Sequence, residues 1–244
     1  MLFLFPKKKI VLDCFTHSES ILQTAPITNA MKHIPSWWKK LPSSRQGTAF
    51  FPEPTMKGCI GMVDYYANSV ALPLWSDLIV NVDLNKHYQW QFSDRLSEAI
   101  THDSNQHIGF LNNYGHLKLI TPWFLKTKKD VKWVWSQPVY NFNADVVNVK
   151  ILPGVMSFKH QHKANINMML SLDQPKQYFL EQGQVLVHLT PLSDHKVEVV
   201  RHLINQSEYA KMHNLNPSLT FTNIYKNSIK QRQKFSDCPY RKDK

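Results

Sequence analysis

Short runs of strand-forming residues, separated by turn residues, fill most of this chain. Roughly ten such runs lie between about residues 9 and 200. In residues 78–84 and 88–92 apolar and polar side chains alternate, and Asn85-Lys86-His87 joins the two runs as a predicted hairpin. This spacing is typical of an antiparallel β-sandwich, a jelly roll or a barrel. We therefore predict a mainly β protein.

Further patterns help to define the β-rich part. Residues 185–189 and 196–200 form a second predicted hairpin, with its turn at Ser193-Asp194-His195. The runs 146–152 and 155–163 are separated by Pro153-Gly154, a dipeptide that favours a turn. We predict that each of these runs is a strand.

The C-terminal part of the chain has a different pattern. Residues 207–213 and 218–234 favour helices, and Pro217-Ser218 marks the start of the second one. No internal repeat or linker interrupts the chain before them. We predict a β-rich domain over residues 1–205 and a basic helical appendage over residues 206–244 that packs on it.

What the sequence lacks argues against several classes of protein. It has 7 glycines in 244 residues and no phosphate-binding loop, Gly-x-Ser-x-Gly elbow or His-Glu-x-x-His motif. The three cysteines form no CxxC pair, and we interpret Cys59 as a small buried thiol. The apolar run over residues 1–5 is too short for a signal peptide or a membrane span. We expect no membrane association.

One local pattern indicates metal chemistry. If residues 155–163 form one strand, Phe158, His160 and His162 share a face. Lys159, Gln161 and Lys163 lie on the other face, and the two lysines must face water. Both imidazoles are then expected to point inward, where a third ligand such as His188 can complete a metal site. A carboxylate could take that third position instead, from Asp145, Asp173 or Glu181. The competing interpretation is two histidines packed in a polar part of the core.

The spacing of Gly154, five residues, and His160-x-His162 resembles the first motif of the cupins, which are β-barrel proteins. The resemblance implies Fe(II) or another divalent transition metal and an oxygenase activity. It covers nine residues, and the acidic ligand that cupins place three or four residues later is replaced by Ile166 and Asn167. A later cupin histidine follows a glycine by about three residues, whereas His188 follows Gly183 by five.

Positive charge gathers at the C-terminus. The net charge is +11, and the final 19 residues contribute +5 of it. Such a segment can bind nucleic acid by releasing counterions, dock on an acidic protein, or form a solvated helix face. The candidate contact residues are Lys226, Lys230, Arg232, Lys234, Arg241 and Lys242.

Aromatic residues make up 12% of the chain, including seven tryptophans. Trp133 and Trp135 are the one pair spaced regularly enough to suggest a platform for sugars, because alternate residues of a strand share a face. Packing in the core is the default interpretation for both side chains.

Four segments, taken together, resemble a group of uncharacterised proteins. They are Ile34-Pro35-Ser36-Trp37-Trp38-Lys39 and residues 57–64, 72–77 and 183–193. The group is common in tailed phages, especially T4-like phages of marine bacteria, and the resemblance covers roughly residues 33–205. It brings no activity and no catalytic residue. It implies a viral origin and a role as a head decoration, a neck or tail accessory, or a fibre-attachment piece.

Three functions stay open. The favoured one is a structural or accessory protein that binds other virion proteins in an oligomeric assembly, located in the virion or the host cytoplasm. It would need no cofactor and would not be an enzyme. The alternatives are a cupin-like Fe(II) oxygenase that uses His160, His162 and His188, and a nucleic-acid-associated protein that uses the basic C-terminus.

Overall fold

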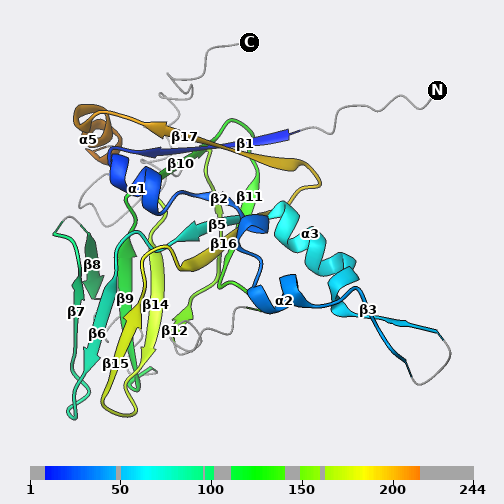
Figure 1. The fold of residues 1–244 in the computed structure, drawn as a ribbon. Coiled ribbons are helices and arrows are strands. Elements are labelled where there is room, and N and C mark those ends of the chain that lie inside the picture. The colour runs from blue at the N-terminus through cyan, green and yellow to red at the C-terminus, as the bar shows by residue number, and fades with distance from the viewer. Residues whose placement is uncertain are drawn as a thin grey trace.

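The first and last strands of the β-rich part lie side by side. Strand β1 (Lys9–Thr16) pairs in parallel with β17 (Lys196–Leu203) and antiparallel with β10 (Phe124–Thr127). This sheet crosses the top of the molecule in Figure 1. The computed structural model describes residues 9–47, 51–95, 97–101, 111–140, 149–159 and 163–214, without the side chains of 213 and 214. Because β1 and β17 run in the same direction, this pair departs from the antiparallel pairing that the sequence predicts.

Within the described residues, the remaining strands form four antiparallel sheets. The largest contains β13 (Gly154–Ser157), β11 (Lys132–Ser136), β16 (Val185–Pro191), β5 (Val70–Pro73) and β2 (Thr28–Asn29). The second contains β12 (Val149–Ile151), β14 (Ile166–Ser171), β9 (Tyr114–Ile120) and β8 (Glu98–Thr101). The third contains β15 (Lys176–Leu180), β6 (Leu78–Val82) and β7 (Tyr88–Phe92), and the fourth β3 (Ser44–Arg45) and β4 (Glu53–Pro54). The predicted fold class, mainly β with sandwich-like antiparallel sheets, is confirmed.

The helices are short, and α3 lies beside the five-stranded sheet (Figure 1). They are α1 (Glu19–Thr24), η1 (Ala30–His33), α2 (Ser36–Lys40), η2 (Met56–Gly58), α3 (Ile60–Asn68) and α5 (Gln206–Asn214). The helix predicted over residues 207–213 is confirmed as α5. Asn205 and Glu208 form a capping box at its start, since each side chain accepts a hydrogen bond from the other's backbone N–H. Residues 218–234 lie outside the described residues.

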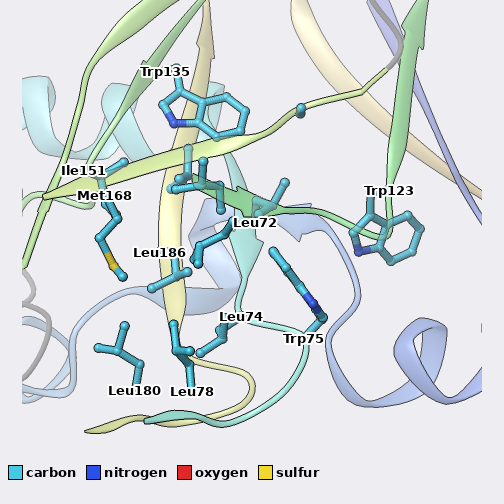
Figure 2. Close-up of a cluster of buried hydrophobic side chains, with 14 of the residues drawn as sticks. Leu72, Leu74, Trp75, Leu78, Trp123, Trp135, Ile151, Met168, Leu180 and Leu186 are labelled. Atoms are coloured by element: carbon cyan, nitrogen blue, oxygen red, sulfur yellow. The ribbon is translucent and has the colours of Figure 1, made fainter. Parts of the chain in front are cut away.

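One large apolar core lies between the sheets. Side chains from four sheets contribute to it, and Figure 2 shows Leu72, Trp135, Met168 and Leu186 converging from different strands. Trp133 and Trp135 are both buried there, so they form no platform on the surface. A smaller cluster joins Phe15 and Phe124 to Tyr209 of α5, which holds this helix against the β1 sheet.

Three local predictions need correction. The hairpin over residues 185–200 is wrong, because β16 pairs with β11 and β5 while β17 pairs with β1. The strand over residues 155–163 ends at Ser157, where Phe158 and Lys159 enter a turn. Helix α3 was not predicted, since its glycine-containing start weakens the helical pattern in the sequence.

None of the helices in the described part of the chain has the length and hydrophobicity that a membrane crossing requires.

Candidate functional site

The structure gives separate outcomes for the three predicted metal ligands. His160 and His162 lie outside the described residues, and His188 lies in β16. The predicted strand over residues 155–163 does not continue as far as His160, because the chain turns after Ser157. The Ser157 hydroxyl bonds to Asp130 at 3.0 Å and accepts a hydrogen bond from the backbone N–H of Lys159 at 3.4 Å, which stabilises this turn.

Phe158 and His188 lie on opposite faces of the five-stranded sheet. Phe158 is buried in the large core, with its ring centroid 5.8 Å from that of Trp133. His188 pairs with Ser136 across the strands and points to the other face, because residues alternate along β11 and β16. The sequence predicted that Phe158, His160 and His162 share one face of a strand. Phe158 and His188 are separated by the sheet.

His188 is buried against helix α3 rather than in a pocket between the sheets. Its Nδ1 is 2.9 Å from the hydroxyl of Tyr65, and its ring lies 5.5 Å from that of Tyr66 at nearly a right angle. Burial, with a further contribution from the nearby His33, lowers the pKa of His188 to about 4. The imidazole is therefore neutral at pH 7.

The pairing across the sheet explains why these rings fit together. Thr28, Ala71, His188 and Ser136 lie side by side in one row across β2, β5, β16 and β11. The small side chain of Ala71 leaves space for aromatic rings above it, and Ala71, Tyr66 and Trp38 belong to one buried cluster. This arrangement joins a helix to a sheet. Among the residues that the structure describes, no group of three His, Cys, Asp or Glu side chains is placed to hold a metal ion.

The basic residues predicted to contact a partner lie outside the described residues: Lys226, Lys230, Arg232, Lys234, Arg241 and Lys242. Cys59 differs from its prediction, because it is exposed at the start of α3 instead of buried. Cys59 is followed directly by Ile60, an exposed apolar residue.

We call residues 30–68 the α2–α3 lobe, which contains η1, α2, β3, β4, η2 and α3. In Figure 1 the lobe lies to one side of the sheets, and β3 extends away from them. Three aromatic side chains attach it to the body. Trp37 Nε1 donates to the carbonyl of Tyr140 at 3.0 Å, Tyr66 donates to the carbonyl of Val139 at 2.9 Å, and Tyr65 bonds to His188.

The exposed side of α3 carries two large apolar residues next to the exposed Asp64. Ile60 and Val63, three residues apart on α3, share one side of this helix and are exposed, whereas Met62 and Tyr66 on the other side are buried. Ile60 keeps 75% of its surface exposed. Met56, at the start of the adjacent η2, is exposed as well.

Lysines accompany this apolar surface. Lys39 and Lys40 end α2, and Lys57 Nζ donates to the backbone carbonyls of Trp38 and Lys39 at 3.2 and 2.6 Å. The lobe has five Lys or Arg residues and two Asp or Glu residues. One acidic residue, Glu53, is paired with Arg45 at 2.8 Å. The other, Asp64, is exposed on α3 beside Val63, so the lobe as a whole carries a net positive charge.

The sequence contained one signal for this surface, the i, i+3 spacing of Ile60 and Val63, but burial of the opposite side decides which apolar residues stay exposed. No model of a known protein family matches the chain, and no curated protein matches it.

Proposed function

We propose that this protein is a structural or accessory component of a tailed-phage virion, which docks on an acidic neighbouring protein through the α2–α3 lobe. The observation that carries the proposal is the exposure of Ile60 and Val63 on α3 and of Met56 on η2, which is bonded to α2 and its terminal Lys39 and Lys40.

The exposed apolar residues support a contact that excludes water. A single exposed apolar residue is ordinary on protein surfaces, but a group on one helix, next to charged residues, is typical of an interaction site. Burying Ile60 and Val63 against a partner removes apolar surface from water, which stabilises a complex by roughly 25 cal/mol per Å² of that surface. The lobe already has its own buried cluster on the opposite side of α3, so these residues are not needed to fold it.

The lysines indicate the sign of the partner's charge. Lys39 and Lys40 are exposed at the C-terminal end of α2, and they favour an approaching surface rich in Asp and Glu. Exposed apolar residues in a lobe with net positive charge fit a protein partner better than nucleic acid, because nucleic-acid interfaces are more polar and more uniformly basic.

The resemblance to tailed-phage proteins supports a virion protein as the partner. Two of its four segments, residues 34–39 and 57–64, supply α2, the lysine that bonds to the end of α2, and most of α3. The segments that carry the resemblance therefore include Ile60, Val63 and Lys39 of the proposed docking surface, whereas Lys40 and Met56 lie just outside them.

The experiment is mass spectrometry of purified particles of the phage that encodes this chain, followed by assembly with variants. We expect the protein in the particles, and a loss of incorporation of at least tenfold for Ile60→Asp. Leu84→Asp is the matched control, because Leu84 is 86% exposed in the β6–β7 turn, away from the lobe.

Three outcomes would contradict the proposal. The protein is absent from purified particles, or Ile60→Asp and Leu84→Asp are incorporated equally. In the third, incorporation persists in Ile60→Asp but is lost when residues 226–244 are deleted, with a steep dependence on salt, and that result would favour nucleic acid as the partner.

A further inference from the structure

A cavity of about 460 Å³ opens between α1, α5 and the edges of three sheets. We propose that this cavity binds a small, neutral, polyhydroxylated ligand of the monosaccharide or disaccharide class. The proposal does not depend on the docking function of the α2–α3 lobe, because the cavity is lined by different elements. Its volume is within the range of ~300–1,000 Å³ that is usual for ligand sites.

Segments far apart in the sequence meet at the cavity. Ser18 and Ser20 come from the start of α1, Ser76 from the β5–β6 connection, and Glu98 from β8. Tyr209 closes one side from α5, and its ring lies 4.1 Å from that of His17. The cavity is thus formed by the tertiary fold, and no single sequence motif encodes it.

Residues with hydrogen-bonding side chains are frequent in the wall, between apolar and aromatic ones. The lining residues include five serines, a threonine, a tyrosine and two glutamines. Some of the hydroxyls are already held in place, since Ser76 Oγ bonds to Ser93 Oγ at 2.9 Å and Ser97 Oγ donates to Asp94 at 2.6 Å. Such a wall offers both donors and acceptors, which a ligand with several hydroxyl groups can match.

Two buried polar atoms of lining residues have no hydrogen-bond partner among the described residues, Trp75 Nε1 and His17 Nδ1. Tyr209, Lys163 and Glu98 add a hydroxyl, an ammonium and a carboxylate to the wall. Glu98 lies close enough to influence the pKa of both Lys163 and Tyr209. The wall therefore places hydrogen-bond donors and acceptors of both charge signs close to one another.

The wall carries charges of both signs, which suits a neutral ligand with several hydroxyl groups. Lys163 supplies one positive charge and Asp94 and Glu98 supply two negative ones, whereas burial lowers the pKa of His17 and keeps it neutral at pH 7. A phosphate would meet both carboxylates. Hydroxyl groups can donate to the carboxylates and accept from the ammonium at the same time.

The test is a titration of the full chain with glucose, galactose, N-acetylglucosamine and maltose, followed by saturation-transfer NMR. Glycine, glutamate and inorganic phosphate are titrated in parallel. We expect at least one sugar to bind, with Kd raised about tenfold by Tyr209→Phe and by Lys163→Met, each of which removes one hydrogen-bonding group.

Matched controls separate this site from non-specific binding. Glu181→Gln and Lys196→Met change exposed charges that do not line the cavity, so they should leave the Kd of the sugar unchanged, whereas Glu98→Gln should raise it. Circular dichroism shows whether each variant is folded. The proposal is overturned if no sugar binds to the folded protein, if Tyr209→Phe and Lys163→Met bind as the native chain does, or if an amino acid or phosphate binds in place of the sugars.

Discussion

The two faces of the five-stranded sheet are built on different chemistry. One face carries Trp133, Trp135 and Leu189 into the large apolar core. The other face carries the row of Thr28, Ala71, His188 and Ser136 and is covered by the α2–α3 lobe. The first face is held mainly by burial of apolar surface. The second combines a smaller apolar cluster with hydrogen bonds between side chains, such as Tyr65–His188 and Thr28–His33.

This difference determines how each face responds to change. Loss of volume on the apolar face leaves a cavity in a close-packed core. The polar face depends on hydrogen bonds and on the protonation of an imidazole, so it responds to single atoms and to pH. The lobe that carries the proposed docking surface is attached to the second face.

The largest effect is expected on the apolar face. Trp133→Ala should lower the free energy of unfolding by about 3–5 kcal/mol, because the indole is fully buried and its removal leaves a cavity. Urea denaturation measures the change. Val155→Ala is the control, since Val155 lies on the neighbouring strand, on the other face, and is exposed. A loss below about 1 kcal/mol for Trp133→Ala would mean that this face is not the main source of stability.

Acid should destabilise the polar face through His188. Its pKa is about 4 in the folded protein and near 6.5 when the chain unfolds, so the unfolded state binds more protons between these values. Stability is complete above pH 6.5 and falls as the pH decreases toward 4, by on the order of 3 kcal/mol. Burial also lowers the pKa of His33, which acts in the same direction.

The measurement is the urea midpoint as a function of pH in the native chain and in His188→Asn. The variant should show a shallower dependence between pH 6.5 and 4. His87→Asn, at an exposed position in the β6–β7 turn, should behave as the native chain does. Identical slopes for His188→Asn and the native chain would contradict the assignment.

A smaller effect is expected from the Tyr65–His188 hydrogen bond. Tyr65→Phe should cost about 1–2 kcal/mol, because it leaves His188 Nδ1 buried without its partner. In a double-mutant cycle with His188→Ala, the two changes should cost less together than the sum of the single variants. Additivity within about 0.3 kcal/mol would show that the two side chains do not interact.

The smallest effect is expected at the tip of the lobe. Arg45 and Glu53 form an exposed ion pair between β3 and β4, and exposed pairs contribute at most about 1 kcal/mol. Arg45→Ala should therefore change the urea midpoint little, and less in high salt. A loss as large as that of Tyr65→Phe would show that the hairpin stabilises the whole lobe.

Strands with clear alternation were predictable from the sequence. Residues 78–92 alternate in polarity around a short turn, and β6 and β7 pair with Val82 opposite Tyr88. Residues 131–135 place both tryptophans on one face, as observed in β11. Strand β14 was missed, because the run Ile166–Ser171 is buried on both faces in its second half and therefore does not alternate.

The candidate sites were less predictable than the strands. Tyr65 and His188 are far apart in the sequence, so no local pattern predicts their contact. Which side of α3 is exposed depends on which side packs against the sheet. The expected third ligand, His188, is engaged with the lobe on the face opposite Phe158. For His160 and His162, and for the basic residues after 226, the sequence remains the basis of the prediction.

The sequence alone determined that the chain is mainly β, where many of its strands run, and that α5 follows them, because polarity patterns report which side of a local segment is buried. The tertiary structure decided the partners of each strand, including the parallel pairing of β1 with β17, and with them the cavity and the docking face. Alternation of polarity shows which face of a strand is buried, but it does not show which element packs against that face. The packing partner depends on contacts between residues far apart in the chain.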